Sequence, residues 1–203
     1  MPLKEMLNYL LKFIVFLGLL VLLPIIIISL VLIYFEDGRP IFFFQPRLGK
    51  NKEIFIIYKL RTMRKETPSL GTHEISKDNY LFSGLILRKT KIDELPQLIN
   101  FLKGDLNLIG PRPGLQNQIQ LREYREKDGI FDIRPGITGL SQVLGYDMSN
   151  PKLLSKIDKL YINKNNLRID ICILIATVFK PFKSKVFNIY KDGIENIEVQ
   201  KNV

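Results

Sequence analysis

The chain has 203 residues, enough for one modest domain and an appendage. Its 30 lysines and arginines outnumber 20 aspartates and glutamates, and the net charge of +10 favours anionic partners: phosphate-bearing substrates, acidic lipid surfaces or nucleic acid. A lone cysteine excludes an intramolecular disulfide, and a single histidine without any CxxC motif argues against a metal site built from histidine and cysteine.

The first predicted element is an apolar helix. Residues 13–35, FIVFLGLLVLLPIIIISLVLIYF, carry no charge over 23 positions, about 34 Å as a helix, which is enough to cross a bilayer core. A cleaved signal peptide would have an apolar region of roughly half this length and would end at a small-residue site, whereas this run ends in YFEDGRP. Pro24 removes a backbone hydrogen bond and predicts a kink. Positive residues flank both ends, which suits a re-entrant helix, while a spanning helix remains the alternative.

A β-hairpin is predicted next. Residues 40–46 (PIFFFQP) and 53–58 (EIFIIY) are short, aromatic and β-branched, and Gly49 and Asn51 are turn residues between them. Residues 65–80 are polar and contain proline and glycine, so we expect a mobile loop over or beside a site.

The segment KTKIDELPQLIN, residues 89–100, places two adjacent carboxylates ahead of a proline. Because proline is tolerated only in the first turn of a helix, a helix should begin close to Asp93. In a structural interpretation Asp93 is the N-cap, and Glu94 faces the positive end of the helix dipole. In a chemical interpretation the two carboxylates hold a divalent hard cation through oxygen, while nearby arginines and lysines clamp phosphate.

Other charged and polar residues are candidates for substrate contacts. For Lys59 and Arg61 the simpler interpretation is surface charge that closes a strand. Gln142 could be a turn residue, and Asp158 could pair with a nearby lysine on its helix. The full set of candidate contacts is Lys59, Arg61, Arg88, Arg112, Gln142 and Asp158.

Helices are also expected near the C-terminal end. Residues 153–164 predict one helix, and LRIDICILIATVFKPFKSKVF, residues 167–187, is apolar for about three turns and then basic. The second segment is too short to span a bilayer. Either its apolar side is buried in the protein core, or it lies in the membrane interface with its lysines at headgroup level.

Four segments in order behind the apolar helix resemble the bacterial sugar transferase family, the monotopic phosphoglycosyl transferases that start glycan assembly on a polyprenyl carrier. These are IFFFQPRLG, YKLRTM, RKTKIDELPQLINFLKGDLNLIGPRP and IRPGITGLSQV. The match covers nearly all of residues 5–185. With the predicted elements it implies an α+β fold: a re-entrant membrane helix over 1–38 that is broken at Pro24, a small, mostly helical catalytic domain over 39–190 with interfacial amphipathic helices, and a polar tail over 191–203.

The resemblance also implies a two-step reaction. Asp93 would attack the β-phosphate of a UDP-sugar and release UMP, and the phosphosugar would pass from Asp93 to polyprenyl (undecaprenyl) phosphate. Glu94 would serve Mg²⁺ and proton handling, so Asp93 and Glu94 are the expected metal residues. Arg112 of the Pro-Arg-Pro motif would lie near phosphate or nucleotide.

The implied setting is the cytoplasmic face of the bacterial inner membrane, with inner-membrane lipids as partners and a homodimer as a further expectation. Nucleic acid is not an expected partner, because the sequence has no nucleic-acid-binding motif or aromatic stacking platform. Where the family often shows Trp-Ala this chain has Leu140-Ser141, and Leu23 replaces a small polar residue before Pro24. The alternative function is a non-catalytic membrane adaptor that holds anionic lipid or partners. No spacing in the sequence names the sugar.

Overall fold

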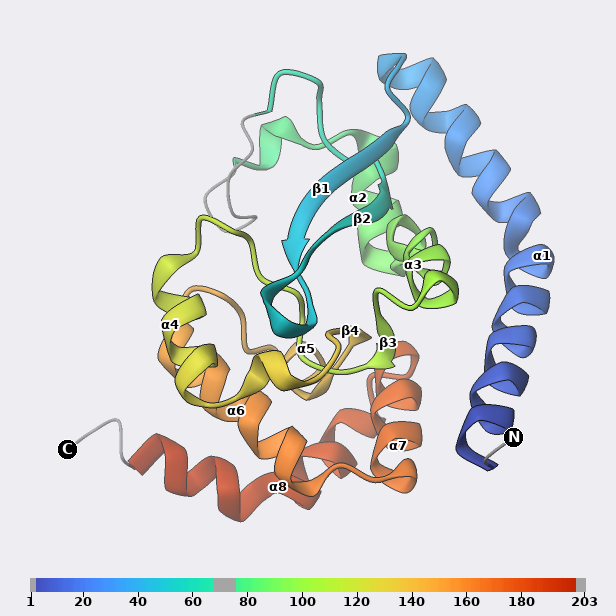
Figure 1. The fold of residues 1–203 in the computed structure, drawn as a ribbon. Coiled ribbons are helices and arrows are strands. Elements are labelled where there is room, and N and C mark those ends of the chain that lie inside the picture. The colour runs from blue at the N-terminus through green and yellow to red at the C-terminus, as the bar shows by residue number, and fades with distance from the viewer. Residues whose placement is uncertain (1–2, 68–75, 200–203) are drawn as a thin grey trace. The chain divides into compact units, whose positions relative to one another are not determined.

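The computed structural model describes residues 3–67 and 76–199, which form helices and two small two-stranded sheets (Figure 1). The predicted mixture of helix and strand is therefore confirmed. The chain divides into two compact units: Met1–Gln45 with Ile56–Gly104, and Pro46–Phe55 with Asp105–Val203. The expected division into membrane segment, catalytic domain and tail is a functional one and stays a prediction.

In the first unit, α1 (Leu3–Asp37) runs without interruption through Pro24. Within the described parts of the chain it is the one helix long and apolar enough to cross a membrane, judged by length and composition. Most of its large apolar side chains are exposed, as Val21 and Phe35 are. The chain does not turn back at Pro24 in this structure, so re-entry into the membrane remains a proposal.

A hydrophobic cluster joins α1 to the rest of the first unit. Ile26 and Ile33 of α1 pack with Leu60, Leu81 and Leu87, and Ile33 is fully buried. The Lys12 ammonium also donates a hydrogen bond to the Leu102 carbonyl at 3.0 Å. One side of α1 is therefore built into the first unit, while its remaining surface is apolar and uncovered.

The predicted hairpin is confirmed: β1 (Phe42–Leu48) pairs with β2 (Ile54–Leu60) across the short turn η1 (Lys50–Lys52). Asn51 adopts a left-handed conformation with φ 53°, as suits a turn residue. After the hairpin, the chain forms η3 (Lys77–Asn79) and α2 (Phe82–Thr90). Half of the predicted mobile loop, with His73, lies outside the described residues.

The short helix η4 (Ile92–Glu94) and α3 (Gln97–Lys103) complete the first unit. α3 ends at Gly104, because glycine accepts the left-handed conformation (φ 90°) in which its N–H reaches the Asn100 and Phe101 carbonyls.

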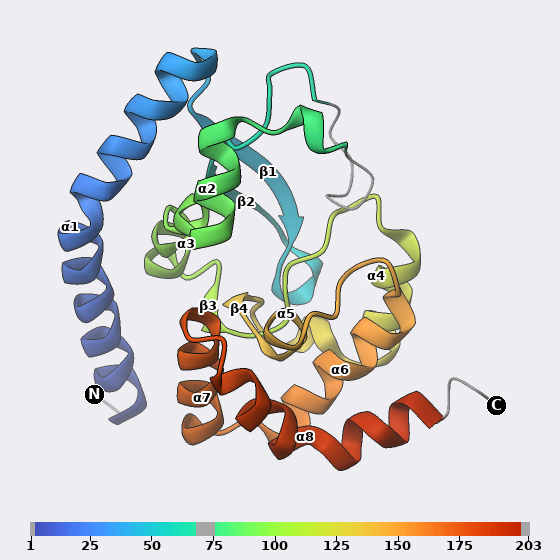
Figure 2. The same cartoon turned by 180° about the vertical axis from the view of Figure 1, so that it is seen from behind.

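The second unit contains a parallel pair of strands and most of the helices (Figure 2). β3 (Asn107–Ile109) pairs with β4 (Gly136–Thr138), with Asn107 opposite Gly136. The remaining elements are α4 (Ile119–Lys127), η5 (Ile130–Asp132), α5 (Leu140–Leu144), α6 (Pro151–Lys164), α7 (Leu167–Val178) and α8 (Phe182–Val199).

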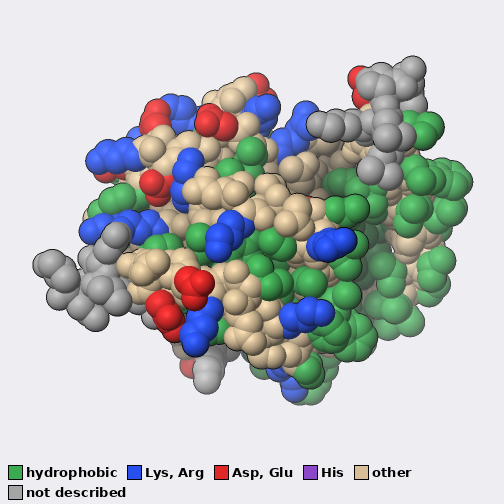
Figure 3. Space-filling view, turned by 90° about the horizontal axis from the view of Figure 1, so that it is seen from below, with side chains coloured by type: hydrophobic (Ala, Val, Ile, Leu, Met, Phe, Trp, Pro, Cys, Tyr) green, Lys and Arg blue, Asp and Glu red, His purple; other side chains and the backbone are tan. Residues whose placement is uncertain are grey.

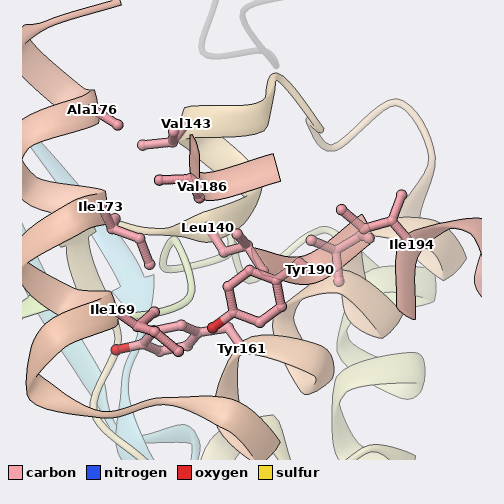
Figure 4. Packing of buried hydrophobic residues seen from close by; sticks show 10 residues of the cluster. Leu140, Val143, Tyr161, Ile169, Ile173, Ala176, Val186, Tyr190 and Ile194 are labelled. Atoms are coloured by element: carbon pink, nitrogen blue, oxygen red, sulfur yellow. The ribbon is translucent and has the colours of Figure 1, made fainter. Parts of the chain in front are cut away.

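The core of this unit forms where α5, α6, α7 and α8 meet, and Figure 4 shows the α7 side chains pointing toward those of α5 and α8. Ile173 and Tyr190 are fully buried in it. Ile194 packs there too, so α8 carries the core into the segment expected to be a polar tail.

The structure confirms that one side of α7 packs in the protein core, whereas a position of α7 in the membrane interface stays a prediction. Its buried side packs in the core, whereas Leu174 and Val178 are exposed and Lys180, Lys183 and Lys185 follow. Basic side chains stand among apolar ones on the face drawn in Figure 3.

Candidate functional site

The two adjacent carboxylates lie in the turn η4 between α2 and α3. Lys91, in a left-handed conformation with φ 60°, ends α2 and starts the turn. The turn is closed by bonds from Glu94 N to Lys91 O (3.2 Å) and from Leu95 N to Ile92 O (3.1 Å). A helical turn does begin close to Asp93, but the N-cap assignment was wrong. Asp93 lies inside the 3₁₀ turn because Lys91 starts that turn, and α3 begins later, at Gln97.

The two carboxylates differ in burial, and a lysine pairs with one of them. Asp93 is 5% exposed, whereas Glu94 is partly exposed. The ammonium of Lys59, on β2, lies 2.7 Å from Oε1 of Glu94, and the Lys59 side chain is also largely buried. The structure therefore brings Lys59 to the dyad rather than leaving it as surface charge at the end of a strand. A carboxylate–ammonium pair screened from water interacts more strongly than an exposed pair.

Arg61, directly after β2, contacts the end of α1. One amino group pairs with the Asp37 carboxylate, and the other donates to the carbonyls of Asp37 (3.2 Å) and Gly38 (2.8 Å). With these contacts and 5% exposure, the Arg61 guanidinium joins the hairpin to α1.

Arg88 lies over the ring of Tyr80, with 4.9 Å between the guanidinium carbon and the ring centroid.

The contact between the end of α1 and the start of α2 was not predicted from the sequence. The Glu36 carboxylate accepts hydrogen bonds from the backbone N–H groups of Phe82 (2.5 Å) and Ser83 (2.9 Å). Leu81, the N-cap of α2, supplies no side-chain bond, so Glu36 performs the capping from a distant part of the chain. The only sequence signal was the pair Glu36-Asp37 directly after the apolar run.

The other candidates, Asp158, Gln142 and Arg112, belong to the second unit. Asp158 of α6 is 1% exposed and accepts hydrogen bonds from Arg125 Nη2 (2.6 Å) and Ser141 Oγ (2.9 Å). Burial raises the pKa of Asp158, and the two donors oppose that rise. An enclosed carboxylate with two such partners has an internal role rather than a substrate contact. Its ionic partner is Arg125, not the nearby lysine considered from the sequence.

Gln142 and Arg112 differ from Asp158 in burial and in hydrogen bonding. The Gln142 amide donates to the Ile137 carbonyl at 2.9 Å, which fits the turn role, and its Oε1 is buried without a hydrogen-bond partner in the described structure. The Arg112 side chain is partly exposed, while its carbonyl accepts a hydrogen bond from Arg125 Nη1 at 2.7 Å. Arg125 was not identified from the sequence, where it is one of several charges on a polar helix.

The donor set can be tested for a metal. No group of three or more histidine, cysteine, aspartate or glutamate residues in the described parts of the chain could form an all-protein cage. Mg²⁺, however, is commonly held by one or two carboxylates together with substrate phosphates and water. Asp93 and Glu94, adjacent in one turn, fit that second arrangement.

Comparison with known proteins gives one family. Residues 2–184 match the family described as "Bacterial sugar transferase". A Bacillus subtilis protein named "Uncharacterized sugar transferase EpsL" is 37% identical over 162 residues, which cover 79% of each chain.

Two further relatives are named for a reaction. "UDP-N-acetylgalactosamine-undecaprenyl-phosphate N-acetylgalactosaminephosphotransferase" of Aeromonas hydrophila is 35% identical over 76% of this chain and 38% of its own length. "UDP-glucose:undecaprenyl-phosphate glucose-1-phosphate transferase" of Caulobacter vibrioides is 35% identical over 76% of this chain and 61% of its own length. The chain thus spans less than two thirds of these two relatives.

Proposed function

Because the chain belongs to the bacterial sugar transferase family and is a membrane-associated transferase, we propose that it moves a sugar 1-phosphate from a UDP-sugar to polyprenyl phosphate and releases UMP. The names of the Aeromonas and Caulobacter relatives combine a UDP-sugar donor with an undecaprenyl-phosphate acceptor. The observation that carries the proposal is the buried Asp93 beside Glu94, with the Lys59 ammonium 2.7 Å from Glu94.

In the first step the Asp93 carboxylate attacks the β-phosphorus of the UDP-sugar. The bond from that phosphorus to the oxygen bridging it to the α-phosphate breaks, and UMP leaves with the electron pair. The phosphosugar is then held on Asp93 as an acyl phosphate. A carboxylate nucleophile divides one difficult transfer into two easier ones.

In the second step a phosphate oxygen of the polyprenyl phosphate attacks the same phosphorus. The bond to Asp93 breaks, the carboxylate is restored, and polyprenyl-diphosphate-sugar leaves. Glu94 takes up the proton of the acceptor phosphate when that phosphate arrives protonated. The Lys59 ammonium orients Glu94 and adds positive charge where phosphate oxygens gather.

Glu94 and Asp93 would hold Mg²⁺ together with the diphosphate oxygens. The bound ion would neutralise charge on the diphosphate and on departing UMP.

We also propose that α1 is re-entrant and that both of its ends lie at the cytoplasmic face of the inner membrane. Lys4 and Lys12 precede the uncharged run and Arg39 follows it, which suits a return to one face. α2 supports a position at the membrane surface. Phe82, Leu85 and Ile86 form an exposed apolar stripe on α2, and Glu36 ties the first residue of that helix to the end of α1. A homodimer stays a prediction.

The decisive experiment is to trap the covalent intermediate without acceptor. Purified protein is incubated with a panel of UDP-sugars that includes UDP-N-acetylgalactosamine and UDP-glucose, and UMP is measured. With the cognate donor we expect UMP up to one equivalent per enzyme, and mass spectrometry should place one added phosphosugar on the peptide that contains Asp93. Asp93→Asn should abolish both signals, whereas the matched control Asp192→Asn, at an exposed position of α8, should retain them. The same assay in EDTA should lose the signal if Mg²⁺ is required.

An adduct on another residue would refute the role of Asp93, as would turnover by Asp93→Asn at a rate near that of the unsubstituted enzyme. The adaptor alternative makes the opposite prediction, since a protein that only binds lipid or partners would retain its function in Asp93→Asn.

A further inference from the structure

The loop of residues 111–114, which contains the Pro-Arg-Pro motif, is held by hydrogen bonds to its carbonyl groups. Its two prolines have no N–H, so at those positions the backbone can accept hydrogen bonds but cannot donate them. All four of its carbonyls accept hydrogen bonds within the second unit. The donors are Gly136 N to Pro111 O (2.9 Å), Arg125 Nη1 to Arg112 O (2.7 Å), Arg47 Nη1 to Pro113 O (3.1 Å) and Leu48 N to Gly114 O (3.1 Å).

One of these donors belongs to a buried ion pair. Arg125 is 3% exposed and Asp158 is 1% exposed, with 2.6 Å between Arg125 Nη2 and Asp158 Oδ2. The other oxygen of Asp158 accepts from the Ser141 hydroxyl at 2.9 Å. Removing two charges from water is expensive, and such a pair is often no more stabilising than apolar side chains of similar volume. Stability alone is therefore a weak reason for Arg125 and Asp158 to be there.

Geometry gives a stronger reason. The planar guanidinium of Arg125 directs one amino group at Asp158 and the other at the Arg112 carbonyl. A lysine ammonium at the same place has no such rigid fork. Asp158 thus fixes Arg125, and Arg125 fixes the backbone of a residue that stands between two prolines of restricted φ.

We propose that Arg125, with Asp158 as its counter-ion, is a positioning residue for Arg112. This inference rests on the proposed function and on the expectation, implied by the Pro-Arg-Pro motif, that the Arg112 side chain lies near a phosphate of the nucleotide. The backbone of Arg112 is held, so the point from which its partly exposed side chain starts is set before the ligand arrives. A group ordered in advance loses less entropy on binding, which raises affinity. Arg125 itself touches no substrate and acts only through Arg112.

The test replaces the ion pair by apolar side chains in the full-length protein. Arg125→Met combined with Asp158→Leu removes both charges and the donor to Arg112. Affinity for UDP, with Mg²⁺ present, is measured by titration calorimetry in detergent. The double variant should bind UDP on the order of three- to tenfold more weakly, because the backbone of Arg112 must then be ordered when the ligand binds. Glu126→Gln is the matched control, because Glu126 is the next residue of α4, exposed and paired with Lys52, and its UDP affinity should be unchanged.

A double-mutant cycle that combines these substitutions with Arg112→Ala distinguishes a positioning role from a general structural effect. If Arg125 acts through Arg112, adding the double substitution to Arg112→Ala should weaken UDP binding no further, because coupled residues are not additive. Circular dichroism and the melting temperature establish that each variant is folded. If the double variant does not fold, Arg125→Lys is used in its place, since it keeps the charge but loses the fork, and the same weakening is expected.

Three results would overturn parts of this argument in distinguishable ways. Unchanged UDP affinity in the folded double variant, while Arg112→Ala weakens binding, would refute the positioning role and leave the proposed function intact. Fully additive effects in the cycle would also refute it. Unchanged affinity in Arg112→Ala would refute the expected place of Arg112 near a phosphate, and the inference would fail with it.

Discussion

Gly84→Ala in α2 should disturb both the fold and the dyad, because the structure leaves no room for a methyl group there. A Cβ at Gly84 would lie 2.1 Å from the carbonyl oxygen of Thr62, whereas ordinary contacts begin at 3.4 Å. The obstacle is backbone rather than a flexible side chain, so α2 and the segment after β2 must separate by about 1.3 Å. The hydrogen bond from Leu81 N to Thr62 O, 3.1 Å long, spans the same contact and would be strained or lost.

The expected size follows from three contributions. Overpacking costs about 1–3 kcal/mol. Loss of the hydrogen bond adds about 1 kcal/mol. The higher helix propensity of alanine offsets about 1 kcal/mol. The net loss of about 2 kcal/mol corresponds to a melting temperature lower by about 4–8 °C for a chain of this length. Since α2 leads through Lys91 into the turn that carries Asp93, a displacement of this kind can reduce turnover by about 10²-fold.

The assay pairs thermal unfolding with UMP release in the same detergent preparation. The chain has no tryptophan, so unfolding is followed by circular dichroism of the helices. Gly18→Ala, at a position in α1 where a Cβ meets nothing within 4 Å, is the matched control: it should leave turnover unchanged and, through the same helix propensity, should not lower the melting temperature. A Gly84→Ala protein that melts and turns over like the unsubstituted enzyme would show that the contact between α2 and Thr62 does not constrain the dyad.

Two further predictions concern pH and topology. Burial raises the pKa of Asp170, partly offset by the Tyr161 hydroxyl that donates to it at 2.8 Å. The folded protein therefore binds a proton on the Asp170 carboxyl more tightly than the unfolded chain does. The protonated Asp170 contributes to stability at low pH, and this contribution declines as pH rises from about 3.9 toward the folded pKa. Asp170→Asn, whose amide oxygen can still accept from Tyr161, should flatten that decline in melting temperatures measured from acidic to neutral pH, and an unaltered slope would contradict the assignment. For topology, Leu3→Cys in a Cys172→Ser background should escape a membrane-impermeant maleimide in intact cells, whereas labelling would identify a helix that crosses the membrane.

Local features of the chain were sufficient to predict several elements. The long apolar helix follows from 23 uncharged residues, because length and apolar character do not depend on distant contacts. The hairpin follows from two aromatic and β-branched runs around turn residues, and the end of α3 follows from Gly104, which favours a left-handed cap. Asp93 and Glu94 were recognisable as a candidate pair because they are adjacent and precede Pro96.

Only the tertiary structure decided which side chains meet. Lys59 pairs with Glu94, 35 residues away in the sequence, and Arg125 pairs with Asp158, 33 residues away. The chain is basic and offers each carboxylate many other lysines and arginines as partners. From the sequence Asp158 was a candidate substrate contact, whereas the structure shows it as the buried counter-ion of Arg125, which was not among the candidates. Sequence periodicity reports which face of an element is apolar, but the choice of ionic partner depends on how elements distant in the chain pack and exclude water, and that is determined only when the chain is folded.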